Sequence, residues 1–127
     1  MAAHNDLGKQ GEEIAKDFFV SKGFRILASN WRSGRYELDF IAENEDLTVI
    51  VEVKTRVGNV FGNPEDFITD GKMQRILRAT HNYILANKIE KNIQIDVVSI
   101  VFSKDGSHKL EHFPDAITPK WYYGLYK

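Results

Sequence analysis

The chain has 127 residues, of which 43% are hydrophobic and 28% charged, and its 17 Lys and Arg against 18 Asp and Glu give a formal net charge of −1. A chain of this size and composition predicts one globular domain with a substantial core. The absence of cysteine excludes disulfides, a thiol nucleophile and cysteine-ligated metal sites. The near-neutral charge argues against non-specific coating of nucleic acid, but it is compatible with a local basic patch.

The sequence lacks the apolar segments that direct a protein to or across a membrane. The first ten residues contain no apolar run, and nowhere do about eighteen apolar residues follow one another. We therefore expect neither a signal peptide nor a membrane helix. A cytoplasmic protein without a membrane partner is the expectation that follows.

The first predicted element is an amphipathic helix over residues 7–20. Its apolar side chains recur every three or four positions, so they form one stripe. Asn5 or Asp6 is available as N-cap and Gly23 as terminator.

The rest of the chain reads mainly as strands, with one further helix. Apolar and polar residues alternate in some segments, and β-branched runs predict a central strand covered on both faces. The predictions in chain order are a strand at 24–27, a loop at 30–35, a strand at 36–41, a turn at 43–46, a strand at 47–53, an irregular crossover at 57–67, a helix at 70–87, and strands at 93–102 and 109–113. This order predicts an α/β fold with a mixed central sheet flanked by helices.

The tail at 119–127 is rich in aromatic residues, whereas free tails are normally polar. We expect it to pack on the domain or on a partner.

The most informative pattern is a carboxylate on each strand of the central hairpin. With a turn at 43–46, Ala42 lies opposite Leu47 and Asp39 opposite Ile50. Glu52 is then the diagonal neighbour of Asp39 on the same face, ~7 to 8 Å away at the backbone. One cation can bridge that span between two carboxylates.

The chemistry of this pair indicates a metal site. Neighbouring carboxylates beside an apolar strand are costly unless a cation compensates them. Mg²⁺ takes one or two carboxylates together with water and phosphate oxygens, so Asp39 and Glu52 suit Mg²⁺ or Mn²⁺. Lys54 continues on the same face, where it could stabilise an attacking hydroxide or developing phosphorane charge. These residues suggest phosphodiester hydrolysis; an ordinary salt-bridge ladder at the solvated end of a strand is the alternative interpretation.

An ordered set of motifs adds a family resemblance. The motifs are Gly8-Lys9-Gln10-Gly11-Glu12, Glu37-Leu38-Asp39-Phe40-Ile41, Val51-Glu52-Val53-Lys54-Thr55-Arg56, Phe61-Gly62 and Asp96-Val97-Val98. With them the chain resembles the YraN-like family of small bacterial proteins, which is similar to PD-(D/E)XK restriction-endonuclease-like nucleases, including archaeal Holliday-junction resolvases. The resemblance implies a restriction-endonuclease-like core of order α-β-β-β-α-β and a metal-centred catalytic site of Asp39, Glu52 and Lys54. By motif position, Glu12 corresponds to a glutamate of the first helix that joins the site in the resolvase branch.

Helical geometry separates Glu12 from its neighbour. Glu12 lies on the border of the apolar stripe, whereas Glu13, about 100° further around the axis, faces water. One interpretation is that Glu12, like many glutamates at such a border, only covers the edge of the core. With the resemblance, Glu12 is the fourth predicted catalytic residue and the third metal ligand.

Five basic residues are candidates for binding nucleic-acid phosphates: Arg32, Arg35, Arg56, Lys72 and Arg75. Lys72 follows a glycine near the start of a helix, where an anion could meet the helix N-terminus. Arg32 and Arg35 lie near Trp31, which could stack a splayed base. A solvated basic face, and a core position for Trp31, are the alternatives.

We expect a metal-dependent nuclease or nucleic-acid-binding protein, with Mg²⁺ or Mn²⁺ as cofactor and DNA favoured over RNA as partner. Two other hypotheses stand beside it. One is a catalytically silent nuclease-fold binding module, and the other is a protein–protein adaptor that works through the aromatic tail. Junction-cleaving nucleases act as two-fold pairs, so a homodimer is a further option.

Overall fold

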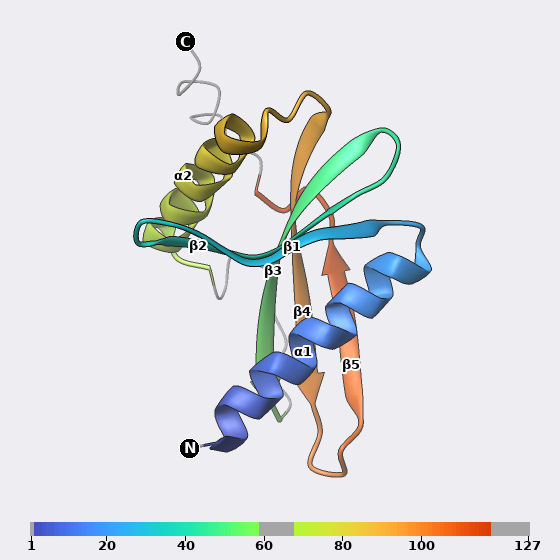
Figure 1. The fold of residues 1–127 in the computed structure, drawn as a ribbon. Coiled ribbons are helices and arrows are strands. Elements are labelled where there is room, and N and C mark those ends of the chain that lie inside the picture. The colour runs from blue at the N-terminus through green and yellow to red at the C-terminus, as the bar shows by residue number, and fades with distance from the viewer. Residues whose placement is uncertain (1, 59–67, 118–127) are drawn as a thin grey trace.

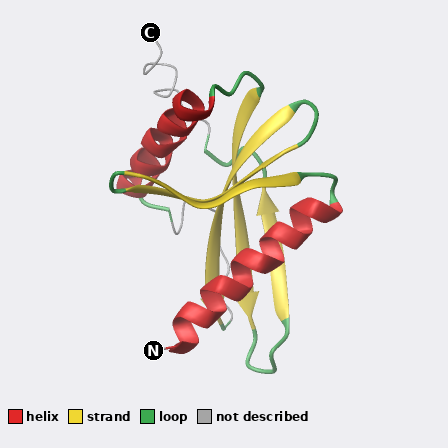
Figure 2. Cartoon of the chain, viewed as in Figure 1, coloured by secondary structure: helices red, strands yellow, loops and turns green. Residues whose placement is uncertain are grey.

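The computed structural model describes residues 2–58 and 68–117. Within them, two helices cover opposite faces of a five-stranded sheet (Figures 1 and 2). In chain order the elements are α1 (Ala2–Ser21), β1 (Arg25–Ser33), β2 (Tyr36–Glu43), β3 (Leu47–Val57), α2 (Asp70–Asn87), β4 (Asn92–Phe102) and β5 (His108–Phe113). The mixed α/β architecture is confirmed. The aromatic tail at 119–127 and the Phe61-Gly62 motif lie outside the described residues.

The strands are ordered β1-β2-β3-β4-β5 across the sheet, and only β3 and β4 run parallel. The β3–β4 ladder extends from Leu47 opposite Asn92 to Val57 opposite Phe102. By contrast, β2 pairs with β3 only from Phe40 to Glu43. The sheet therefore has a long parallel centre, beside which β2 separates early from β3.

Two apolar clusters lie on the two sides of β3. The cluster under α2 includes Ile50 and Leu77, and the cluster under α1 includes Phe19, Val49 and Val51. All five side chains are almost fully buried. The expectation that this strand is covered on both faces is confirmed, because alternate residues of one strand point to opposite faces.

The helix boundaries match the predictions at three of four ends. Helix α2 covers the predicted residues, and the side chain of its N-cap Thr69 accepts a hydrogen bond from the Lys72 amide at 3.1 Å. Helix α1 ends before Gly23, whose φ of 92° is the left-handed conformation of a terminating glycine. Its start was predicted wrongly. The helix begins at Ala2, so Asn5 lies within it and does not cap it.

Of the segment 30–35, which was predicted as a loop, only residues 34–35 form a turn, and residues 30–33 are strand. Strand β1 continues to Ser33, which pairs with Tyr36 across a two-residue turn in which Gly34 has a φ of 63°. Pairing with β2 satisfies the backbone of these polar residues, and Trp31 packs on the apolar cluster under α2. The strand at 24–27 is accordingly longer than expected. The β1–β2 hairpin extends beyond the point where β2 leaves β3.

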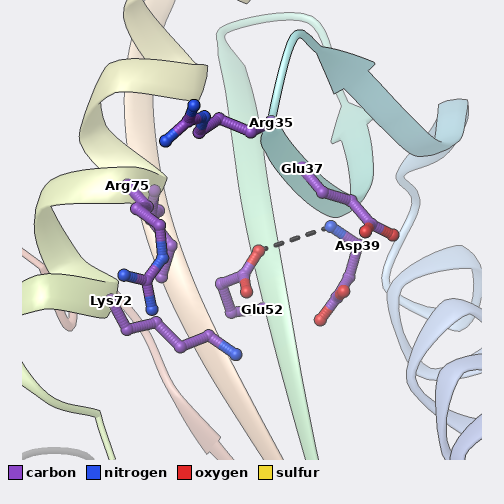
Figure 3. A pocket seen from close by; sticks show the side chains of 7 residues that line it. Arg35, Glu37, Asp39, Glu52, Lys72 and Arg75 are labelled. Carbon is purple, nitrogen blue, oxygen red and sulfur yellow. Dashed lines mark hydrogen bonds between the residues drawn. The ribbon is translucent and has the colours of Figure 1, made fainter.

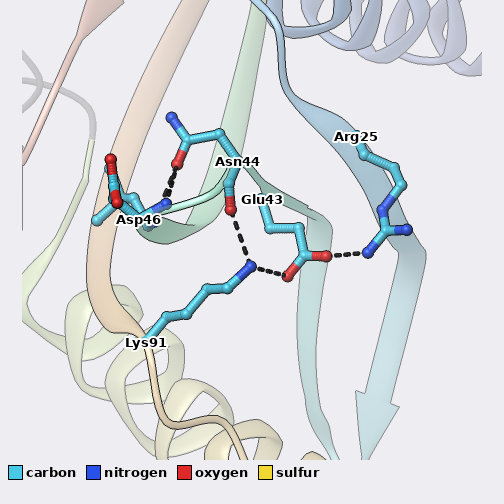
Figure 4. Close-up of polar contacts among 6 residues, drawn as sticks. Arg25, Glu43, Asn44, Asp46 and Lys91 are labelled. Carbon is cyan, nitrogen blue, oxygen red and sulfur yellow. Dashed lines mark hydrogen bonds and ion pairs between the residues drawn. The ribbon is translucent and has the colours of Figure 1, made fainter.

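The register of the β2–β3 hairpin differs from the prediction by two residues. Ala42 lies opposite Val49. The Asn44 Oδ1 accepts hydrogen bonds from the amides of Asp46 at 3.0 Å and Leu47 at 2.9 Å, which moves the loop one residue further along the chain (Figure 4). A shift of two residues keeps every side chain on its predicted face.

A small ion-pair network lies beside the same loop. The Glu43 carboxylate accepts hydrogen bonds from Arg25 of β1 and from Lys91, which precedes β4 (Figure 4). These two bonds lower the pKa of the Glu43 carboxyl. The network therefore connects β1 and β2 to the segment that precedes β4 at one end of the sheet.

Candidate functional site

Asp39 and Glu52 lie where the β2–β3 ladder opens. Continuing the register beyond Phe40 and Val51 places Asp39 directly opposite Glu52, so the predicted position opposite Ile50 was wrong. At this point carboxylate side chains, rather than backbone carbonyls, accept the hydrogen bonds between the two strands. The Val53 amide donates to Asp39 Oδ2 at 2.8 Å. The Asp39 amide donates to Glu52 Oε2 at 3.3 Å, the bond drawn in Figure 3. The two acidic residues are therefore closer neighbours than the diagonal pair that the sequence predicted.

Burial dominates the electrostatics of the pair. Glu52 is only 5% exposed, and burial raises its pKa well above the usual range, with the negative charge of Asp39 as the next cause. Burial also raises the pKa of Asp39, against the hydrogen bond from Val53 and the positive charge of Lys72, which lower it. Both carboxylates therefore favour a proton or a metal cation as compensation.

The pair lines a pocket of about 260 Å³ between α2 and the tip of the β1–β2 hairpin (Figure 3). Its lining residues are Arg35, Glu37, Asp39, Glu52, Lys72, Arg75 and Ile76. In Figure 3, Lys72 and Arg75 extend from α2 towards Glu52, and Asp39 lies on the other side of Glu52. The pocket thus combines an acidic pair with three basic side chains.

Lys54 lies two residues beyond Glu52 on β3. It lines a small neighbouring cavity of about 10 Å³, together with Glu52 and Lys72. Burial lowers the pKa of Lys54, and the positive charges of Lys72 and Arg56 lower it further. Lys54 is therefore near the acidic pair but outside the described lining of the larger pocket.

Glu12 approaches the pair from the α1 side of the sheet. It is half-buried; burial raises its pKa, and the nearby charge of Asp39 is the next cause. Glu13, in contrast, is 69% exposed, so the predicted difference between the two neighbours is present. The close approach of α1 depends on Gly11, because a Cβ at that position would overlap Oγ1 of Thr55 on β3.

Three of the five predicted phosphate-binding residues, Arg35, Lys72 and Arg75, line the pocket. Arg32 does not. Its side chain is 73% exposed and its guanidinium lies 3.4 Å from the Glu37 carboxylate. Arg56 is also outside the described lining, although it is close enough to affect the pKa of Lys54.

Trp31 is partly buried and packs against the core, as in the alternative to base stacking. Its ring meets Tyr83 of α2 edge-on, with the ring centroids 5.1 Å apart. It packs on the apolar cluster under α2. The hairpin is therefore attached to the helix through this aromatic contact.

Two features of the structure were not among the site residues predicted from the sequence. Glu37 lines the pocket, and its charge contributes to the raised pKa of Asp39, Glu52 and Glu12. The acid-x-acid spacing with Asp39 was the available signal. The second feature is the buried Asp96, whose Oδ2 lies 2.7 Å from His112 Nε2. No local spacing connects these two residues, which meet through β4–β5 pairing.

The chemistry of the site fits Mg²⁺ or Mn²⁺ held by two carboxylates, those of Asp39 and Glu52, rather than by a full set of protein ligands. Within residues 2–58 and 68–117, no three Asp, Glu or His side chains are arranged to hold a metal ion. However, Asp39 and Glu52 supply hard oxygen ligands. The hydrogen bonds from the backbone amides use only one oxygen of each carboxylate. Mg²⁺ typically uses one or two protein carboxylates, so the donor set is adequate for it.

Fold and pocket define a mixed α/β protein with an acidic pair at a break in its sheet. The family model for the uncharacterised protein family UPF0102 matches residues 11–100, and the chain belongs to that family. It is 42% identical to a UPF0102 protein of Flavobacterium psychrophilum over 116 residues, covering 91% of this chain and 97% of the relative. A UPF0102 protein of Phocaeicola vulgatus is 39% identical over 119 residues, with 94% and 98% coverage.

Among solved structures, the chain is similar to Pyrococcus furiosus SfsA in complex with Ca²⁺. The sequence identity is 14% and the TM-score 0.43, with 87% of this chain and 63% of that chain covered. Similarity at this level carries no argument about function. In the part of the chain that the structure describes, no helix is both long and apolar enough to cross a membrane.

Proposed function

We propose that this protein is a metal-dependent nuclease with a restriction-endonuclease-like core, which hydrolyses phosphodiester bonds in nucleic acid, DNA in preference to RNA. The observation that supports this most directly is the Asp39–Glu52 pair at the break between β2 and β3. A buried acidic pair that opens into a pocket with basic walls suits a cation and a phosphate together. A purely structural salt-bridge ladder would have no need of such a pocket.

Asp39 and Glu52 are the proposed ligands of Mg²⁺ or Mn²⁺, and Glu12 is the third acidic group directed to the same site. When bound, the metal would supply an acidic water and neutralise phosphate charge. Lys54 stabilises the charge that develops as the phosphodiester bond is attacked. Its position beside Glu52 supports this assignment.

Arg35, Lys72 and Arg75 are the proposed phosphate contacts, since they line the same pocket as the acidic pair. Guanidinium groups can bind phosphate oxygens in pairs, and lysine acts as a point charge. Arg56 lies near Lys54 and is a proposed contact for a neighbouring phosphate. Arg32 is the weakest of the five, because its charge is already paired with Glu37.

The test presents duplex, single-stranded, flapped and four-way-junction DNA, and RNA, with Mg²⁺ or Mn²⁺, and measures cleavage and binding separately. We expect cleavage of at least one DNA substrate and its loss with EDTA. Lys54→Ala should retain metal binding but lose most of the cleavage, because its charge acts mainly in the transition state.

Lys104→Ala is the matched control, because Lys104 is an exposed lysine in the β4–β5 turn. Cleavage by Lys54→Ala at the wild-type rate would contradict the proposed mechanism. Tight binding without cleavage of any substrate would instead identify a silent binding module. No binding to any nucleic acid would favour the adaptor hypothesis.

A further inference from the structure

The tip of the β1–β2 hairpin is attached to α2 rather than to the rest of the sheet. From Tyr36 to Asp39, β2 is outside its recorded ladder with β3, while β1 continues to pair with it. On the helix side, Asn82 Nδ2 donates a hydrogen bond to Ser33 Oγ at 3.1 Å. The Trp31–Tyr83 ring contact lies on the same side. These two contacts connect the hairpin and the helix that form the two walls of the pocket.

Arg35 depends on this attachment for its position. It is an exposed residue in the turn after Ser33, and it lines the pocket from the hairpin wall. Arg75 lines the pocket from the helix wall (Figure 3). An arginine on a free hairpin tip would lose much conformational entropy on binding an anion, whereas a tip already held in place loses less.

We propose that Asn82 and Ser33 are positioning residues, which hold the hairpin tip on α2 so that Arg35 and Arg75 bind one phosphate of the substrate from opposite walls. This inference rests on the proposed function, because it takes the pocket to be the phosphate-binding site. It assigns a role to two residues that are not among those lining the pocket. The substrate class is a phosphodiester-linked strand.

The experiment is a double-mutant cycle, read as the dissociation constant for a short single-stranded oligodeoxynucleotide in EDTA and again with Mg²⁺. Arg35→Ala should weaken binding about tenfold, as expected for loss of a charge-assisted contact. Asn82→Ala and Ser33→Ala should each weaken it about two- to tenfold, the range of one lost hydrogen bond. In the Arg35→Ala background, Asn82→Ala should have no further effect, because there is no guanidinium left to position.

The control is Asn87→Ala, which removes a side-chain hydrogen bond from the same helix, donated to the Tyr83 carbonyl at 3.1 Å. It should leave the dissociation constant unchanged. Melting temperatures of all variants separate a folding defect from a positioning effect.

The outcomes distinguish the two proposals. Additive losses from Asn82→Ala and Arg35→Ala, or no loss from Asn82→Ala, would overturn the positioning role while leaving the phosphate contact intact. No effect of Arg35→Ala, or no binding by the wild type, would overturn both the phosphate pocket and the positioning role.

Discussion

Asp39 and Glu52 lie opposite each other in neighbouring antiparallel strands, and the amide of Asp39 donates its hydrogen bond to the Glu52 carboxylate instead of to a strand carbonyl. The Asp39 carboxylate in turn accepts from the next amide on β3, that of Val53. The two acidic side chains are thus fixed by the backbone of the opposite strand. Their mutual repulsion is therefore built into the fold. Three of the four predictions below concern how the protein compensates it, and the fourth concerns the packing of α1 that places Glu12.

The first prediction is metal-dependent stability. Mg²⁺ or Mn²⁺ should raise the melting temperature, because a ligand that binds only the folded state stabilises it. Asp39→Asn should abolish this increase, since it removes one of the two proposed ligands. Calorimetric titration measures the affinity directly. Equal metal affinity in wild type and Asp39→Asn would exclude the site assignment.

The second prediction concerns pH and uses Glu52, whose pKa burial raises. Because the folded state holds this proton more tightly than the unfolded state, the stability that it contributes is fully present below the unfolded pKa near 4.5. It is lost as pH rises from there through the raised folded pKa. Glu52→Gln should remove this decline and make the metal-free protein more stable at neutral pH.

Denaturant unfolding at a series of pH values in EDTA checks this prediction. Glu45→Gln, a change of an exposed glutamate in the β2–β3 loop, is the matched control and should preserve the decline. An unchanged pH profile in Glu52→Gln would show that the buried carboxyl is not its cause.

The third prediction compares Glu12→Gln with Glu13→Gln. Glu12→Gln should weaken metal binding or cleavage, and metal-free stability should stay equal or rise, because charge repulsion with Asp39 is relieved. Glu13→Gln should change stability by no more than about 0.5 kcal/mol and leave function intact, since Glu13 is exposed. Identical behaviour of the two variants in titration and cleavage assays would remove Glu12 from the site.

The fourth prediction concerns Gly11. Gly11→Ala should destabilise the protein by about 1–3 kcal/mol, the usual cost of overpacking, because the new Cβ overlaps Thr55 Oγ1. The loss should be smaller in a Thr55→Ala background, which removes that oxygen. Chemical denaturation of the four variants in this cycle measures the coupling.

Gly8→Ala provides the control, because α1 has open space around Gly8. The substitution should be neutral or stabilising by about 0.5–1 kcal/mol, the ordinary preference of a helix for alanine. If Gly11→Ala were equally harmless, the close packing of α1 on β3 would not be what places Glu12.

The fold could be predicted wherever local chemistry decides it. The apolar stripe predicted α2 at its observed bounds, and the structure shows that the Thr69 side chain caps its start. The segment 30–35 was different, because polar residues predict a loop, yet pairing with β2 and the packing of the partly buried Trp31 make most of it strand. That outcome depends on partners distant in sequence.

The site could be predicted in its residue types and its face, but not in its register. Alternation placed Asp39 and Glu52 on one face, and a two-residue shift does not change that. The observed register goes with a loop in which the Asn44 side chain accepts hydrogen bonds from the Asp46 and Leu47 amides. The composition of the segment did not distinguish this loop from the predicted turn at 43–46. The hydrogen bond between Asn82 and Ser33 joins residues 49 positions apart, and no sequence pattern predicts it.

The length of the β3–β4 ladder has a consequence for local unfolding. Glu52 lies inside this ladder, opposite Val97 of β4, so the backbone of the β3–β4 ladder should exchange hydrogen only when the centre of the sheet opens. The hairpin tip pairs with one strand and is attached to α2 by few contacts, so it should exchange by a smaller and more frequent opening. Hydrogen exchange should therefore show the hairpin tip opening locally while the amides of the β3–β4 ladder stay protected.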